Sequence, residues 1–106
     1  MPKYLWQVSY TADGVRGIMK DGGSQRRRVV QDLIVKAGGR LEGFYYAFGE
    51  SDVIVIADLP DPATAVAASF AVNATSAARL KTTVLLTPEE LDAAAKKSVD
   101  YRPPGA

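Results

Sequence analysis

The chain has 106 residues, with 13 Lys and Arg against 12 Asp and Glu, and contains neither His nor Cys. A net charge of +1 gives no basic field for nucleic acid or an anionic membrane surface, and no apolar run is long enough to span a bilayer. Without imidazole or thiol groups we expect no metal site and no cofactor. We expect one cytoplasmic domain over residues 1–106, with residues 99–106 as a C-terminal tail.

The first third of the chain predicts a strand followed by two helical pieces. Aromatic and apolar residues alternate with the others from Lys3 to Tyr10, which is typical of a strand. Apolar residues at helical spacing follow in residues 15–19, and Gly22-Gly23 interrupts that helix. Ser24 is a suitable N-cap for a second helix over residues 24–37, which Gly38-Gly39 ends.

The middle of the chain predicts an antiparallel hairpin. Residues 40–48 and 53–59 form its strands, and the four residues 49–52 form its turn. The second of these strands is apolar without interruption over residues 53–57, which indicates that both of its faces are covered.

The last part predicts a helix, a strand and a final helix. Asp61 caps a helix over residues 63–73, a strand covers residues 78–86, and Thr87 opens a capping box for a helix that runs to about Ser98. The resulting β-α-β-β-α-β order is that of a ferredoxin-like α+β sandwich, with a four-stranded antiparallel sheet and an extra C-terminal helix.

One face of such a sheet lacks helices, and in this sequence that face is not regularly polar. Leu5 and the apolar run at residues 53–57 indicate that it is covered. We therefore expect a homodimer that packs sheet against sheet, with space for a pocket between the sheets. The alternative is that the last helix and the tail cover this face. The proline-containing tail, residues 101–104, is read as a stiff strap that docks on its own or a neighbouring subunit.

Several segments together resemble the GYD domain family of small bacterial proteins. They are residues 4–11 (YLWQVSYT), 38–42 (GGRLE), 46–50 (YAFGE), 81–90 (KTTVLLTPEE) and 101–105 (YRPPG). The resemblance covers nearly the whole chain, and it implies the dimeric α/β-barrel type of fold. Where the family motif reads Gly-x-Tyr-Asp, this chain has Gly49-Glu50-Ser51-Asp52, so that Ser51 replaces the tyrosine. The family supplies no general activity.

Charged residues provide three candidate sites, each with an ordinary alternative. Asp52, and less so Glu50, could act as a base or hold a cation, although acids and glycines are also what tight turns use. The run Arg26-Arg27-Arg28 near a helix start could hold a carboxylate or phosphate, or could be a solvated helix face. Arg79 and Lys81 share one face of a strand and could meet an acidic ligand or acidic residues across the dimer.

Aromatic residues provide the remaining candidates. Trp6 and Tyr45 are predicted to bind ligand; Tyr4, Tyr10 and Tyr46 are further candidates for lining a pocket. The function predicted is a small-molecule binding or regulatory module for a small acidic or aromatic metabolite, with the chain itself as its partner and with neither nucleic acid nor membrane. The alternative is a cofactor-free enzyme, monooxygenase-like or isomerase-like, with a pocket at the sheet face.

Overall fold

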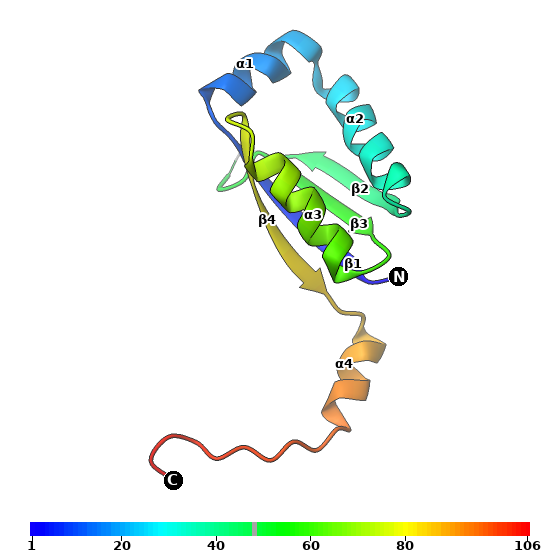
Figure 1. Ribbon diagram of the computed structural model, residues 1–106, viewed down its shortest axis with the longest axis vertical. Helices are drawn as coiled ribbons and strands as arrows, with labels where there is room; N and C mark the ends of the chain where they lie inside the picture. Colours follow the sequence, from blue (N-terminus) through cyan, green and yellow to red (C-terminus); the bar gives the residue numbers. More distant parts are fainter. Residues whose placement is uncertain (48) are drawn as a thin grey trace.

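The computed structural model describes residues 1–47 and 49–106 of the chain (Figure 1). In chain order its elements are β1 (Lys3–Tyr10), α1 (Ala12–Asp21), α2 (Gly23–Lys36), β2 (Arg40–Tyr46), β3 (Val53–Asp58), α3 (Pro62–Asn73), β4 (Ala78–Leu85) and α4 (Pro88–Ala95). This is the predicted ferredoxin-like α+β fold, in which the first helical connection is divided into α1 and α2.

The sheet has four strands in the order β2-β3-β1-β4, and all of its pairings are antiparallel. β1 is a central strand: Trp6 lies opposite Val55 of β3 on one side and Thr82 of β4 on the other. Because side chains alternate along a strand, Tyr4 and Trp6 point toward the helices, whereas Leu5 points to the other face. β1 therefore provides the floor of the space beneath the helices.

The core lies between the sheet and the helices. Its largest fully buried members are Ile34 of α2, Val53 and Val55 of β3, and Leu59. α3 fits closely against β4 because Asn73 ties the two together. The Asn73 amide oxygen accepts from the Leu80 backbone N–H at 2.7 Å, and its amide nitrogen donates to the Leu80 carbonyl at 3.1 Å.

The break between α1 and α2 lies at Gly22, within the Gly22-Gly23 pair that the sequence indicated, but the N-cap of α2 lies two residues earlier than predicted. Gly22 has φ of +84°, a conformation that a residue with a Cβ rarely adopts, and it is both the C-cap of α1 and the N-cap of α2. The prediction that Ser24 caps α2 is wrong, since Ser24 lies inside the helix, which begins at Gly23. Tyr46 fixes this start, because its hydroxyl donates to the Gly23 carbonyl at 3.0 Å.

Three strand ends and two helix ends differ from the predictions, and one of these is α2, which ends at Lys36 rather than at residue 37. β2 ends at Tyr46, and the predicted extension includes residue 48, which lies outside the described residues. β3 and β4 each end one residue earlier than predicted. α4 ends at Ala95 rather than near Ser98, with tighter i→i+3 bonds from Lys96 and Lys97 in its last turn. A short helix of this kind depends on packing to extend further, and α4 projects away from the body (Figure 1).

The face of the sheet opposite the helices is open in the described part of the chain, and α4 does not cover it (Figure 1). Ile54 and Ile56 of β3 are partly exposed there, and Tyr45 of β2 is 67% exposed. At one end of this face the Asp58 carboxylate accepts from Lys3 Nζ at 2.8 Å and from Arg40 Nη2 at 3.1 Å. The hydrogen bond from Lys3 is the main reason that the pKa of Asp58 lies below its usual value. None of the described helices is long and apolar enough to cross a membrane.

Candidate functional site

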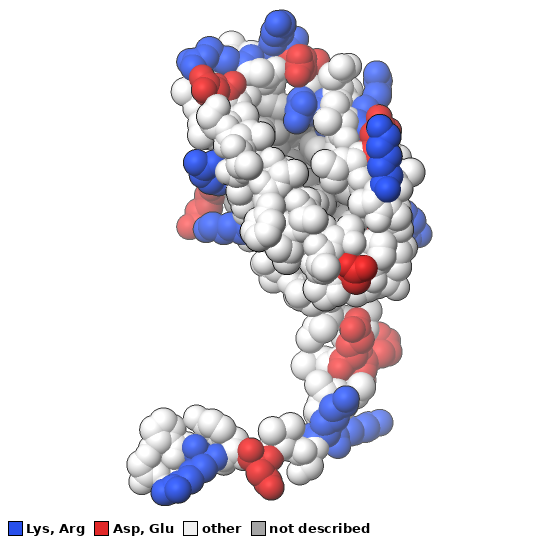
Figure 2. Space-filling view, viewed as in Figure 1, with Lys and Arg blue, Asp and Glu red and all other residues white. Residues whose placement is uncertain are grey.

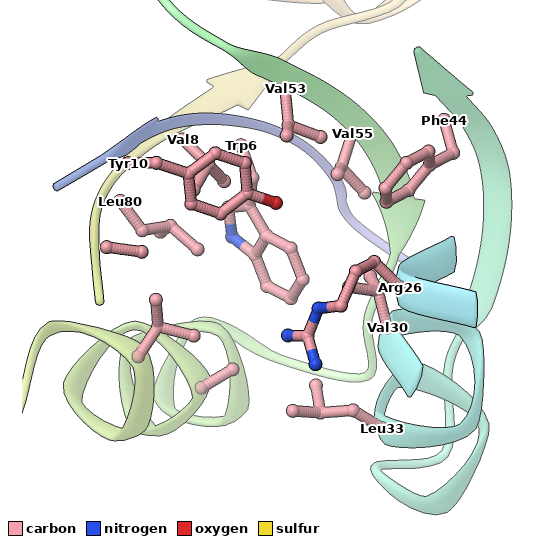
Figure 3. Close-up of a pocket in the computed structure, with 13 residues that line it drawn as sticks. Trp6, Val8, Tyr10, Arg26, Val30, Leu33, Phe44, Val53, Val55 and Leu80 are labelled. Atoms are coloured by element: carbon pink, nitrogen blue, oxygen red, sulfur yellow. The ribbon is translucent and has the colours of Figure 1, made fainter. Parts of the chain in front are cut away.

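A cavity of about 80 Å³ lies between the sheet, α2 and α3 (Figure 3). Figure 2 shows the same face of the molecule hollowed between these two helices. The walls of the cavity are almost entirely apolar: Trp6, Val8, Tyr10, Val30, Leu33, Phe44, Val53, Val55, Ala68, Val72, Ala78 and Leu80, together with Arg26. It opens on the helix side of the sheet, whereas the sequence placed a pocket between the open faces of two sheets.

Trp6 occupies the middle of this site. The strand alternation of β1 points its ring toward the helices, and only 3% of the residue is exposed. Its Nε1 is buried and has no hydrogen-bond partner among the described residues. Figure 3 shows the indole ring standing between the sheet and the layer that Arg26 and Leu33 occupy. A buried N–H group without an acceptor is uncommon, because a buried donor that makes no hydrogen bond costs about 1–3 kcal/mol.

Arg26 brings a positive charge to this apolar site. It lies in the first turn of α2 and is half-buried, unlike Arg27 and Arg28, which are exposed. Its guanidinium points into the space below Trp6 (Figure 3). Among the lining residues that the structure describes, it is the one charged group. A guanidinium can bind a carboxylate through two parallel hydrogen bonds, so the cavity joins an apolar interior to an anion-binding group.

Two tyrosines border the same region. Burial is the largest cause that raises the pKa of Tyr10, and the nearby Tyr46 raises it further, while Arg26 partly opposes both effects. Burial also raises the pKa of Tyr46, again partly offset by Arg26. Both phenols are therefore neutral at pH 7; each has one O–H to donate, and that of Tyr46 is already donated to the Gly23 carbonyl.

A second hollow, of about 340 Å³, lies on the other side of Tyr10. It is lined by Tyr10, Val15, Ile18, Met19, Gly23, Tyr46, Ala47 and Asp52. Tyr10 borders both spaces, so its side chain stands between the small cavity, which Arg26 also lines, and the larger, open hollow. A ligand bound at this point would place its apolar part in the cavity and its polar part beside Arg26.

The two acidic candidates lie in the hairpin turn, and both residues bond to β1. One carboxylate oxygen of Asp52 accepts from the Tyr10 backbone N–H at 2.7 Å, and the Asp52 backbone N–H donates to the Val8 carbonyl at 2.8 Å. Glu50 is exposed, and its backbone carbonyl accepts from the Ser9 hydroxyl at 3.4 Å. Asp52 also borders the larger hollow, and its carboxylate bonds to β1 rather than to the backbone of its own turn.

The other predicted ligand-binding residues lie away from Trp6. Tyr45 and Lys81 belong to the open face of the sheet, where each is exposed. The Arg79 side chain bonds to the end of α3 and to the residues that follow it. Its Nη1 donates to the carbonyls of Asn73, Thr75 and Ala78 at 3.1–3.2 Å. The structure thus brings together Trp6, Arg26 and Tyr10, and leaves Tyr45, Arg79 and Lys81 outside the cavity.

The cavity exists because small residues line part of it, and these residues were not identified from the sequence. Ala68 of α3 and Ala78 of β4 line the cavity, and no larger residue fills the gap between them and Trp6. The Ala-rich composition of α3 was the available signal, because it lets a helix lie close to a sheet. It does not say at which alanine a gap remains.

No group of three or more acidic side chains that could hold a metal ion occurs in residues 1–47 and 49–106. The family model described as GYD domain matches residues 4–95. That match includes every residue of the cavity and the larger hollow. No curated protein and no solved structure matches the chain.

Proposed function

The chain belongs to the GYD domain family, and on that premise we propose that this protein is a homo-oligomeric module that binds a small acid with an apolar or aromatic body. The observation that carries the proposal is the half-buried Arg26 guanidinium, the one charged group among the described lining residues of an otherwise apolar cavity.

The size of the cavity limits the ligand. Sites for drug-sized ligands have volumes of about 300–1,000 Å³, and the cavity is well below that range at about 80 Å³. It suits a short branched chain or part of a ring. The carboxylate would bind at Arg26, and a longer ligand would continue past Tyr10 into the larger hollow.

Binding is favoured over turnover by the chemistry of the walls. The described lining of the cavity contains no carboxylate, and the sequence contains neither His nor Cys, so no general base of the usual kind faces a ligand there. The carboxylate of Asp52 is occupied by the Tyr10 backbone N–H. A cofactor-free enzyme would have to use a tyrosine whose pKa is raised, which makes it a poorer base at pH 7.

The homo-oligomer is part of the proposal and rests on the open face of the sheet. Leu5, Ile54 and Ile56 form a partly exposed apolar group at its centre, beside the exposed Tyr45. A second copy placed sheet to sheet would cover these side chains. We also propose that the protein is cytoplasmic, which rests on the composition of the chain, and that it binds neither nucleic acid nor membranes.

Binding of small carboxylates tests the proposed function. Benzoate, phenylacetate, indole-3-acetate and isobutyrate would be compared with their uncharged amides by calorimetry and by thermal unfolding. We expect at least one acid to bind and its amide to fail. Arg26→Gln should weaken that acid about ten- to hundred-fold, because a charge-assisted hydrogen bond contributes about 1.5–3 kcal/mol.

Arg27→Gln is the matched control, since it removes the same charge from the same turn of α2 but from an exposed side chain. It should leave affinity within about twofold. If none of the four acids binds the wild type, or if both variants weaken the acid equally, the assignment of the cavity as an anion site is wrong.

A further inference from the structure

The outer surface of α3 is apolar although it is exposed. Val66 and Phe70, one helical turn apart, are 46% and 70% exposed, and α3 contains no charged residue. Figure 2 shows the corresponding uncharged surface at the centre of this face, with charged side chains around it. A helix without a polar side is normally covered on all sides.

β4 extends this apolar surface. β4 starts near the end of α3, where Leu80 bonds Asn73, and runs back alongside the helix. At about 3.3 Å per residue, Val84 lies about 13 Å further along, beside the first turns of α3. Val84 faces the helix layer yet is 58% exposed. We refer to Val66, Phe70 and Val84 as the α3–β4 ledge.

The C-terminal arm, residues 87–106, also has exposed apolar side chains. Leu91 is 61% exposed, Val99 83% and Tyr101 76%. In Figure 1 the arm extends from the end of β4 away from the rest of the chain. The radius of gyration is 16.8 Å, against about 13 Å for a compact domain of this length.

The start of α4 sets the direction of the arm. Leu86 and Thr87 alone link β4 to α4. The Thr87 hydroxyl accepts from the Glu90 backbone N–H at 3.1 Å, and the Glu90 carboxylate accepts from the Thr87 backbone N–H at 3.1 Å. Pro88 in the first turn restricts the backbone further. Because the capping box holds residues 87–90 together, reversal of α4 onto the ledge of its own chain would need a sharp turn of the backbone at Leu86.

We propose that the C-terminal arm of each subunit packs on the α3–β4 ledge of a second copy of the chain, in a reciprocal exchange. Each chain then holds both halves of the contact, and twofold symmetry makes the two contacts equal. The reach is sufficient: α4 spans about 12 Å at 1.5 Å per residue, and the residues after it extend by up to about 3.3 Å each. Together they exceed the 33 Å width of the molecule.

The charges of the arm fit this placement. Glu89, Glu90 and Asp92 surround Leu91 along α4, and Lys96 and Lys97 follow. With Leu91 on the ledge, the charged residues would remain in water at its edges. α3 has no charged residue that could pair with a charged group of a partner. This favours an occupant that offers apolar side chains, as the arm does with Leu, Val and Tyr.

Disulfide trapping tests the exchange directly, because the natural chain has no cysteine. Phe70→Cys and Leu91→Cys chains would be mixed, allowed to exchange subunits, oxidised gently and separated without reductant. Both replaced side chains are mostly exposed, so neither replacement should disturb folding. We expect at least ten times more cross-linked heterodimer than from a mixture of Leu91→Cys with Val35→Cys, which is 59% exposed on α2.

The chain that carries both Phe70→Cys and Leu91→Cys separates the remaining possibilities. A covalent dimer at low protein concentration supports the exchange. An internal disulfide within a monomer would show that the arm folds back on its own chain. Cross-linking of Phe70→Cys alone at an equal yield would show that α3 meets α3, and no cross-link above the Val35→Cys level would also overturn the proposal.

Discussion

Filling the cavity beside Trp6 should stabilise the fold and remove ligand binding together. Ala68 of α3 is half-buried and lines the cavity with a single methyl group. In Ala68→Leu the longer side chain would enter that space from the helix side. Its rotamer preferences suit a helix, and both residues have high helix propensity, so the change tests the cavity rather than the helix.

The size of the effect follows from the cavity volume. An unfilled apolar cavity costs about 24 cal/mol per Å³, so a volume of about 80 Å³ corresponds to at most about 2 kcal/mol. Ordering a buried Leu opposes this by about 0.5–1 kcal/mol. We expect a net gain of about 1 kcal/mol in the free energy of unfolding, or about 4 °C in Tm for a domain of this length.

Urea unfolding followed by Trp6 fluorescence measures this gain, since Trp6 is the one tryptophan and is buried. Ala67→Leu is the control, because Ala67 is exposed on the same helix and should change stability by less than about 0.5 kcal/mol. A loss of 1 kcal/mol or more in Ala68→Leu would refute the packing argument. Unchanged affinity for the acid identified in the wild type would place its site elsewhere.

Three further predictions concern the framework of the site. Gly14→Ala should destabilise the fold by about 1–3 kcal/mol in urea unfolding, because a Cβ would lie 2.1 Å from the Ala77 carbonyl oxygen; Gly17→Ala, where that Cβ meets nothing within 4 Å, should instead gain up to about 1 kcal/mol. Asn73→Ala should lower the free energy of unfolding by about 1–3 kcal/mol, since the backbone N–H and carbonyl of the buried Leu80 lose their bonds to the Asn73 side chain. Asn73→Asp keeps the acceptor, so its stability should fall between those of the alanine variant and the wild type. The lowered pKa of Asp58 stabilises the fold at pH values above the ordinary Asp pKa of 3.8, and this contribution is lost as pH falls through the lower folded pKa. The free energy of unfolding, measured from pH 6 to pH 2, should therefore decline less in Asp58→Asn than in the wild type. Parallel curves for the two proteins would contradict this prediction.

Local patterns were sufficient to predict the elements whose residues also face the core. β1 was predicted at its observed bounds because its alternation matches burial under the helices, and α3 and α4 begin where Asp61 and Thr87 cap them. Ser24 misled the prediction because a good capping residue lies just inside a helix whose start Gly22 and Tyr46 determine. That determination is a tertiary contact, which local sequence does not encode.

The site was predicted less well, for a related reason. Trp6 and Arg26 were both candidates, but nothing local says that one Arg of the run 26–28 turns inward while its neighbours stay exposed. Arg79 was a candidate ligand-binding cation, and local sequence gave no sign that its guanidinium would bond to the carbonyls of Asn73 and Thr75. The cavity exists because Ala68 of α3 and Ala78 of β4 both line the space beside Trp6 of β1, which is more than 60 residues away in the sequence.

The central position of β1 also determines when this fold can form. β1 is the first strand made, but its partners β3 and β4 end at Asp58 and Leu85, so the sheet cannot close until most of the chain has been synthesised. At about 5–20 residues per second that interval is on the order of ten seconds. Until β3 has been made, β1 with Tyr4 and Trp6 has no strand to pair with, and a nascent chain stopped before Ala78 still lacks the strand that pairs with its other edge. The residues that later form the floor of the cavity are therefore the ones that a ribosome-bound chain exposes longest.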